Sequence, residues 1–399
     1  MLALTMFAAT LGTRAAAGAS DGLAEVPVFR SGTEGYHTFR IPAIVRATNG
    51  TLLAFAEGRK SQSGDTGDID LVLKRSFDNG RTWGPLQIVG DNGANTFGNP
   101  MPIVDRTTGK IVLLTTHNAG NVTETELLTG AVNDRRVFVQ ESADHGATWS
   151  AAREITSATK RASWRYYATG PGHGIQLARG AHAGRLIAPC NHSTTNLAGV
   201  SAWAVHLLYS DDGGASWRIG AVDSPNRSLL NPNECSAAEL TDGRIYTVAR
   251  NEEGSSAGNR AFACSRDGGE TFDAPFAIDA SLVSPVVQGS ALRCSAMDHG
   301  GPANRILFSA PGHPSRRARM MVRSSFDEAR TWTAGRVVYD GPSAYSDMVN
   351  LPDGQVGLLY ESGVKHPYER ITFATFGAAF LDSPNAAPTA LDRQPKDLR

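Results

Sequence analysis

Cysteine is scarce in this sequence. The chain has 399 residues and four cysteines, which are Cys190, Cys235, Cys264 and Cys294. No two of them form a Cys-x-x-Cys pair, whereas disulfide-rich domains and zinc sites need numerous or closely spaced cysteines. We therefore expect neither a disulfide framework nor a metal site, and buried free thiols are the default for such residues.

The chain also lacks an excess of charge of one sign. Lys and Arg number 38 and Asp and Glu number 39, which gives a formal net charge of −1. This balance does not indicate a nucleic-acid partner or an anionic membrane surface. Any recognition of an anion must therefore be local, and we expect no nucleic-acid partner.

Long hydrophobic runs are missing after the first 20 residues. No later run approaches the roughly 18 apolar residues of a membrane-spanning helix, so we expect no membrane span. Residues 1–20 pass from an apolar run into small residues with an Ala-x-Ala character, without a positively charged start. We predict a signal peptide here and a secreted or periplasmic protein; the alternative is a disordered, mis-started N-terminus.

Glycine and proline, by contrast, are abundant. The chain has 42 glycines and 20 prolines, a composition typical of short elements separated by many turns. This favours an all-β fold. Residues 381–399 have no apolar periodicity and are predicted to form a disordered tail.

An eight-residue pattern recurs along the chain. Its copies are SFDNGRTW (76–83), SADHGATW (142–149), SDDGGASW (210–217), SRDGGETF (265–272) and an altered SFDEARTW (325–332) with Ala329 in place of glycine. Asp can accept backbone N–H groups in a turn, glycine supplies a positive φ, and the aromatic residue can pack beneath the turn. Calcium loops are the alternative, but no copy has the remaining ligands of an EF-hand.

The copies each follow a β-rich run, and their starts lie 66, 68, 55 and 60 residues apart. This spacing suits one four-stranded sheet per repeat, as in a β-propeller. Two further strands near the end bring the prediction to a six-bladed β-propeller over residues 21–380. We expect its last blade to be closed by strand exchange between the termini.

The stretch Phe39-Arg40-Ile41-Pro42 places an arginine between apolar neighbours. Arginines are seldom put inside a hydrophobic run unless a carboxylate or another anion needs them. The alternative is an edge-strand arginine in a surface salt bridge. Together with the repeated Ser-x-Asp-x-Gly-x-Thr-Trp pattern, this motif resembles the sialidase (neuraminidase) family of the bacterial and animal type, over nearly the whole chain.

The resemblance implies three arginines around the carboxylate of a sialic acid, since a guanidinium binds a carboxylate bidentately. Arg40 is the first, and Arg250 in GRIYTVARN matches the second. For the third, the family's arginine lies eight residues before the serine of the last repeat, which selects Arg317 over Arg316 and Arg319.

The resemblance also implies a tyrosine nucleophile, because a carboxylate nucleophile would be repelled by the substrate's own carboxylate. Tyr345 stands at the family's position, with Glu234 as its base and nearby arginines favouring the phenolate. Asp65 is near the position of the acid/base. Asp68 and Asp70 run into the following strand and are expected to be structural.

Further residues match supporting positions. Glu361 matches a glutamate that holds the first arginine, and Arg59 matches an arginine near the substrate's 4-hydroxyl, with a surface arginine as the alternative. Asn99 replaces an aspartate that many relatives have, which puts preference at the 4- and 5-positions in doubt. Three aromatic residues could line the N-acetyl or glycerol side of the pocket or pack in the core: Trp164, Tyr166 and Tyr167.

The resemblance therefore implies an exo-α-sialidase that removes terminal α-linked sialic acids from glycoproteins, glycolipids and oligosaccharides, with retention of configuration and without a cofactor or metal. The active site is expected at the central channel of a monomer. Two alternatives remain open: a non-catalytic sialic-acid- or protein-binding propeller, and a trans-sialidase.

Overall fold

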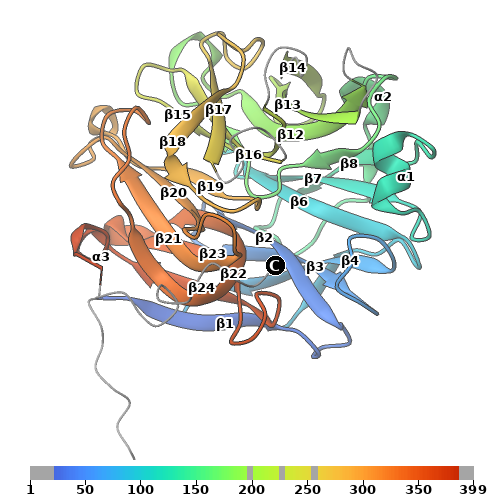
Figure 1. Cartoon of the computed structure of the whole chain (residues 1–399), viewed down its shortest axis with the longest axis horizontal. Helices are drawn as coiled ribbons and strands as arrows, with labels where there is room; N and C mark the ends of the chain where they lie inside the picture. The colour runs from blue at the N-terminus through green and yellow to red at the C-terminus, as the bar shows by residue number, and fades with distance from the viewer. Residues whose placement is uncertain (1–21, 196–200, 224–229, 253–258, 386–399) are drawn as a thin grey trace, which may run out of the picture.

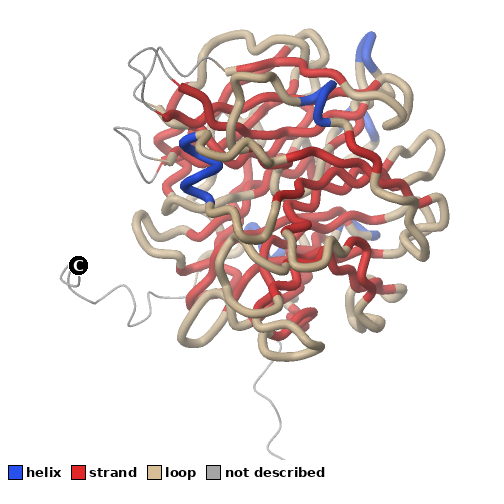
Figure 2. The backbone as a smooth tube through the Cα atoms, turned by 90° about the vertical axis from the view of Figure 1, so that its right-hand side faces the viewer, coloured by secondary structure: helices blue, strands red, loops and turns tan. Residues whose placement is uncertain are grey.

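The computed structural model describes residues 22–195, 201–223, 230–252 and 259–385. The predicted signal peptide lies outside the described residues, as does the predicted tail after residue 385. Strands make up 49% of the described residues and helices 7%, which confirms the all-β prediction. Figure 2 shows strands running through the body of the molecule, with only short helical segments among them.

The strands pair in four sheets, and two of these sheets divide further. In the eight-stranded sheet, β4 and β6 are joined by a single parallel pair, Ile69 with Thr96. In the seven-stranded sheet, β22 (Arg336–Asn350) pairs with β21 through its first part and with β23 through its second part. The division yields six consecutive antiparallel groups of strands; that each group is one propeller blade stays a prediction.

The first group contains β2 (Thr38–Arg46), β3 (Leu52–Arg59), β4 (Ile69–Ser76) and β5 (Gln87–Gly90). The second contains β6 (Thr96–Val104), β7 (Ile111–Asn118), β8 (Arg136–Ser142) and β9 (Arg153–Glu154). The third contains β10 (Tyr167–Thr169), β11 (Ile175–Gln176), β12 (Leu186–Thr195), β13 (Ser201–Ser210) and β14 (Arg218–Val222).

The fourth group contains β15 (Pro232–Glu239), β16 (Ile245–Asn251), β17 (Asn259–Ser265) and β18 (Ala277–Val283). The fifth contains β19 (Ser290–Ser295), β20 (Arg305–Pro311), β21 (Ala318–Ser325) and the start of β22. The sixth contains the rest of β22, β23 (Val356–Ser362), β24 (Arg370–Phe376) and β1 (Ala24–Arg30). The groups follow one another in chain order around a ring (Figure 1).

The N-terminal strand completes the last group. β1 pairs with β24 in antiparallel register, so that Val26 lies opposite Phe373. The predicted closure by strand exchange between the termini is therefore present. Apolar side chains fill the space between neighbouring groups, as Phe29, Phe39 and Phe373 do between the sixth group and the first.

The eight-residue repeats form tight turns. In the first copy, the hydroxyl of Ser76 donates to Asp78 and accepts from the N–H of Gly80, while Thr82 donates its N–H and hydroxyl to Asp78. Gly80 has a φ of 88°. Among the described residues, no cluster of acidic, histidine or cysteine side chains could hold a metal ion.

The aromatic residue of the repeat reaches the neighbouring group as well as its own turn, where Trp217 donates to the carbonyl oxygen of Gly214 at 3.1 Å. The ring of Trp83 packs edge to face on the ring of Phe373 in the preceding group, with 5.3 Å between the ring centroids. The ring of Trp149 packs in the same way on Phe55 of its preceding group, with 5.8 Å between the centroids. The repeats thereby join adjacent groups.

Helices are short and few. The α-helices are α1 (Glu124–Thr129), α2 (Thr156–Thr159) and α3 (Ala378–Asp382), and the 3-10 helices are Gly180–His182, Met297–His299 and Pro352–Gly354. No helix in the described ranges is long and apolar enough to span a membrane. α3 continues past residue 380, and Asn385 accepts a hydrogen bond from the N–H of Val337, so the ordered part extends beyond the predicted boundary.

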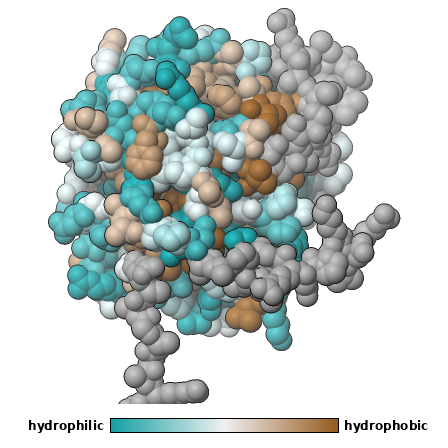
Figure 3. Space-filling model, turned by 60° about the vertical axis from the view of Figure 1, so that its left-hand side comes forward, coloured by the Kyte–Doolittle hydropathy of each residue, from teal (hydrophilic) through white to brown (hydrophobic). Residues whose placement is uncertain are grey.

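The cysteines form no disulfide bonds, and the described surface carries no large hydrophobic area on the face that Figure 3 shows. All four cysteines are free, and Cys190 and Cys235 are buried. On the face in Figure 3, hydrophilic residues are interspersed with small groups of hydrophobic ones.

Candidate active site

A pocket of about 280 Å³ brings together residues from distant parts of the chain. Eight of the nine predicted site residues line it, and they are Arg40, Arg59, Asp65, Asn99, Glu234, Arg250, Arg317 and Tyr345. The ninth, Glu361, is completely buried beneath them. The structure therefore gathers the whole predicted set at one place.

Arg40 is held by Glu361. The Nε and Nη2 atoms of Arg40 donate to the two carboxylate oxygens at 3.0 and 3.3 Å, and the backbone N–H groups of Ile41 and Tyr345 donate to the same carboxylate. Ile41 has a φ of 58°, which is rare for a β-branched residue and costs energy. Glu361 thus fixes a strained turn of backbone, the first arginine and the backbone of Tyr345 together.

Arg250 and Arg317 complete the cationic wall. Arg250 donates to Glu234 at 2.7 Å, to Glu252 at 2.9 Å and to the hydroxyl of Tyr345 at 3.2 Å. Arg317 donates to the hydroxyl of Tyr368 and to a backbone carbonyl, and its guanidinium lies 5.7 Å from the ring of Tyr345.

The alternative registers for the third arginine lie elsewhere. Arg316 is hydrogen-bonded to His313 in an exposed position, and Arg319 lies 3.7 Å from Asp340. Neither of these arginines lines the pocket, whereas Arg317 does. The structure therefore agrees with the choice of Arg317.

Tyr345 and Glu234 are in direct contact. The hydroxyl of Tyr345 donates to Glu234 at 2.5 Å. Burial and the negative charge of Glu234 raise the pKa of Tyr345 well above its usual value, although the guanidinium groups of Arg250, Arg317 and Arg40 act in the opposite direction. The arginines therefore favour the phenolate, as expected, but burial and Glu234 outweigh them in the free protein.

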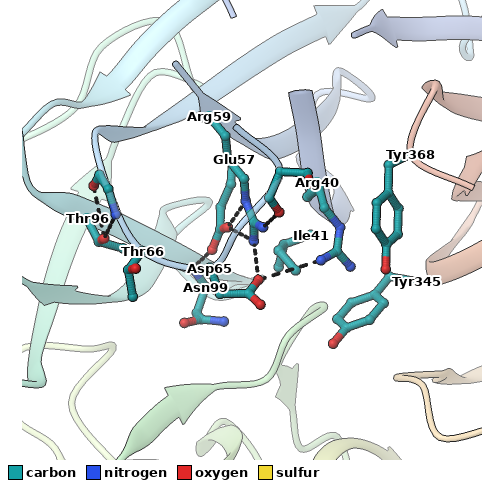
Figure 4. Close-up of polar contacts among 12 residues, drawn as sticks. Arg40, Ile41, Glu57, Arg59, Asp65, Thr66, Thr96, Asn99, Tyr345 and Tyr368 are labelled. Atoms are coloured by element: carbon teal, nitrogen blue, oxygen red, sulfur yellow. Dashed lines mark hydrogen bonds and ion pairs between the residues drawn. The ribbon is translucent and has the colours of Figure 1, made fainter. Parts of the chain in front are cut away.

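Asp65 lies between two arginines, as Figure 4 shows. Its carboxylate accepts from Arg59 at 2.7 Å and is 3.6 Å from Arg40. The Asp65 side chain is 53% exposed. Partial desolvation in the pocket raises its pKa, but the charges of Arg59 and Arg40 outweigh this effect and hold the pKa below its usual value. Asp70, in contrast, is buried away from the pocket, where it accepts from Tyr36 and Lys60.

The Asn99 side chain, on β6, is held by residues in or next to its own group of strands. Its carbonyl oxygen accepts from Thr116 at 2.8 Å and from Arg135, and its backbone N–H donates to Glu57 at 2.8 Å. Glu57 also pairs with Arg59 at 2.6 Å, so this arginine is buried in an ion pair and is not a surface residue. Asn99 and Arg59 therefore form one wall of the pocket.

Of the three aromatic candidates, only Tyr166 lines the pocket. Its ring lies 4.8 Å from the guanidinium of Arg135 and packs edge to face on Trp203, which also lines the pocket. Trp164 and Tyr167 belong to the hydrophobic core between the second and third groups.

Sequence reasoning missed several lining residues, among them Glu57, Glu124, Arg135, Glu252 and Tyr368. Glu57 could have been found, because it precedes Arg59 by two residues on one strand and so shares its face. Tyr368 stacks 3.9 Å from the guanidinium of Arg40, but it lies in a loop whose path the sequence does not reveal.

The sequence of this chain is similar to those of known proteins. Residues 50–358 match the family described as a BNR repeat-like domain. An exo-alpha-sialidase of Aspergillus fumigatus is 32% identical over 90% of this chain and 92% of its own length. The chain belongs to the sialidase family. A sialidase of Micromonospora viridifaciens is 34% identical over 88% of this chain, which spans 53% of that relative.

Solved sialidases share the fold. The Hadza microbial sialidase Hz136 has a TM-score of 0.76 and 25% identity, covering 90% of this chain and 69% of its own. An intramolecular trans-sialidase from Ruminococcus gnavus has a TM-score of 0.74 at 19% identity, covering 89% of this chain and 98% of its own. The β-propeller prediction and the assignment to glycoside hydrolases of the sialidase family are therefore confirmed.

Proposed function

We propose that this sialidase family member is a retaining exo-α-sialidase that hydrolyses terminal α-linked sialic acids of glycoproteins, glycolipids and oligosaccharides. The observation that carries the proposal is the 2.5 Å hydrogen bond from the hydroxyl of Tyr345 to Glu234, directly beside Arg250. A phenol needs a base to act as a nucleophile, and here the base is already in contact with it.

The substrate carboxylate binds to Arg40, Arg250 and Arg317. Each of these guanidinium groups is oriented by a separate partner, namely Glu361, Glu252 and Tyr368. Their remaining N–H groups can therefore meet a carboxylate without first reorganising, which is the condition for strong electrostatic stabilisation. This clamp places the anomeric carbon over Tyr345.

In the first step, the oxygen of Tyr345 attacks the anomeric carbon while Glu234 takes the phenolic proton. The bond to the leaving oxygen breaks, and Asp65 gives that oxygen a proton. Because the pKa of Tyr345 is raised in the free protein, its proton leaves in concert with the attack. The product of this step is a glycosyl-tyrosine.

Asp65 must carry a proton to act as the acid, although its pKa is low in the free protein. The substrate supplies the change. A sugar carboxylate bound to Arg40 offsets the positive charge that stabilises the Asp65 anion, and this raises the pKa of Asp65 in the complex. In the second step, Asp65 takes a proton from water, the hydroxide oxygen replaces the tyrosine oxygen, and Glu234 returns the proton to Tyr345.

The proposal is tested with a fluorogenic α-sialoside. We expect release of the fluorophore by the wild type and a loss of orders of magnitude for Tyr345→Phe, since phenylalanine keeps the ring and removes the nucleophile. Asp65→Ala should slow turnover less than Tyr345→Phe does, because the phenolic leaving group of this substrate needs little protonation. Equal turnover by wild type and Tyr345→Phe would remove Tyr345 from the mechanism, and binding without release would favour the non-catalytic alternative.

Product analysis separates the remaining possibilities. Proton NMR of the first product should show the α-anomer of sialic acid if configuration is retained. Excess lactose as acceptor should yield little sialylated product for a hydrolase, whereas abundant transfer would indicate a trans-sialidase.

We also propose that the protein is secreted or exported to the periplasm and that it is a monomer. Export is checked by N-terminal sequencing of protein recovered outside the cytoplasm, and the monomer by light scattering. A protein that retains residues 1–20 in the cytoplasm would contradict export.

A further inference from the structure

Two buried arginines lie behind the pocket, between the fourth and fifth groups of strands. Arg260 on β17 is 1% exposed and Arg323 on β21 is 5% exposed. The guanidinium carbon of Arg260 is 5.3 Å from the ring centroid of Phe308 on β20, and Phe308 is the cross-strand partner of Arg323. Paired residues on neighbouring strands point to the same face, so both guanidinium groups enter one interface.

Neither guanidinium group has an acidic partner in the described parts of the chain, since no carboxylate lies within the 4.0 Å of an ion pair. Nε and Nη2 of Arg260, Nη1 of Arg323 and the hydroxyl of Tyr246 are buried and have no hydrogen-bond partner there. Asp279 attracts Arg323 from a longer distance, but its carboxylate accepts from Trp332 at 3.0 Å instead.

Such an arrangement is costly. Nη2 of Arg323 donates to the carbonyl oxygen of Val283 at 2.9 Å, but a buried cation without a counter-ion still loses its hydration at a net cost. Burial, with the positive charge of Arg250, lowers the pKa of Arg260 to about 9, and burial lowers the pKa of Arg323 to about 10. Two cations with three unpartnered nitrogen donors in one buried interface match the requirements of a small anion.

We propose that a monovalent anion of the size of chloride binds between Arg260 and Arg323, held by their unused N–H groups and by the hydroxyl of Tyr246. A small anion suits this interface because it is buried between two sheets and Asp279 already supplies part of the compensating charge. The site is separate from the substrate carboxylate clamp, and the proposal does not depend on the proposed function.

The anion lies close to the catalytic groups. Arg250 and Arg260 are cross-strand partners on β16 and β17, so their side chains are neighbours on one face. A bound anion reduces the repulsion between these two cations. We therefore expect it to stabilise the wall that carries Arg250 as well as the interface.

Thermal unfolding at fixed ionic strength tests the proposal, with gluconate exchanged stepwise for chloride. The wild type should show a saturable rise in Tm of about 3 °C, because an anion that binds only the folded state stabilises it by mass action. Arg323→Met should lose this rise. In gluconate alone it should unfold at the same temperature as the wild type or a higher one, since an uncompensated charge has been removed.

Arg305→Met is the matched control. Arg305 is also buried, but it is paired with Asp382, so this variant should keep the response to chloride. A wild type without a saturable response, or an unchanged response in Arg323→Met, would overturn the proposal.

Crystals of the wild type grown in bromide provide a test that does not depend on variants. We expect an anomalous peak within about 3.3 Å of nitrogen atoms of both Arg260 and Arg323. This distance is slightly longer than a hydrogen bond to oxygen, because a halide ion is larger than an oxygen atom. A density there without anomalous signal would identify water alone and contradict the proposal.

Discussion

At the residue scale, the site depends on carboxylates that orient arginines. Glu361 accepts from Arg40 and from two backbone N–H groups, and Glu57 accepts from Arg59 and from the backbone of Asn99. In each case one buried carboxylate determines where a guanidinium group points. Such supporting groups commonly matter nearly as much as the residues that contact the ligand.

Substitution of Glu361 by glutamine should therefore impair catalysis. Glutamine has nearly the same shape, but its amide cannot accept on both sides, and Arg40 would lose the carboxylate that lies nearest to it. We expect kcat/KM to fall about 10- to 100-fold. Much of this fall should come from a higher KM, because Arg40 binds the substrate. The Tm should also be lower than that of the wild type. Glu141→Gln, which only breaks an ion pair with Lys110 at the surface, is the control and should leave both unchanged.

Asp65 should make stability depend on pH. Its pKa is lowered in the folded state by Arg59 and Arg40 despite partial desolvation, so its stabilising contribution is present above the unfolded pKa of about 4 and is lost as the pH falls through the folded pKa. Asp65→Asn should therefore have a lower Tm than the wild type at pH 7, and the gap should narrow below pH 4. A gap that stays constant down to pH 3 would contradict this assignment.

At the element scale, the repeated turn is a unit, and its fifth copy has Ala329 where the others have glycine. The fifth turn has the hydrogen bonds of the others, since Ala329 donates its N–H to Ser325 and Thr331 donates to Asp327. Ala329 nevertheless has a φ of 61°, which only glycine adopts without penalty. The turn forms because its side-chain network and its aromatic anchor outweigh that strain.

Ala329→Gly should stabilise the protein. Relief of the left-handed backbone is partly offset by the loss of a buried methyl group, and we expect a gain of about 0.5 to 1 kcal/mol in the free energy of unfolding. Denaturant unfolding measures it. The reverse change in the first turn, Gly80→Ala, should be strongly destabilising, because a Cβ there would lie 2.0 Å from the ring of Phe373.

At the scale of the whole molecule, the pocket exists only because the ring is closed. Arg40 comes from the first group, Arg250 and Glu234 from the fourth, and Tyr345 from the sixth. β1 seals the sixth group, and Phe29 on this strand is completely buried against Phe39. Loss of this closing strand should therefore affect the whole protein.

Phe29→Ala is expected to cost about 3–5 kcal/mol of unfolding free energy, as for other buried phenylalanines. Activity at temperatures below the transition should persist, since Phe29 does not line the pocket. The control is Phe77→Ala, because Phe77 is 73% exposed and should change stability by less than about 0.5 kcal/mol. Equal effects of the two substitutions would show that β1 does not close the fold.

The sequence by itself determined the repeat, the β-rich composition and the identity of the site residues. These features are local: a turn needs Asp and Gly at set positions, and a motif such as Phe39-Arg40-Ile41-Pro42 is contiguous. The resemblance then supplied Tyr345, Glu234 and Arg317, which the structure brings together in one pocket. Residues whose role depends on loop paths, such as Tyr368, Arg135 and Glu252, had no local signal.

Only the tertiary structure decided the charge states and the packing partners. Whether Tyr345 is a phenol or a phenolate depends on the balance between its burial and the charges of Glu234 and the arginines, which come from different groups of strands. Trp83 likewise packs on Phe373, nearly 300 residues away along the chain. Such contacts follow from closing the ring, because closure brings together surfaces that no local pattern relates.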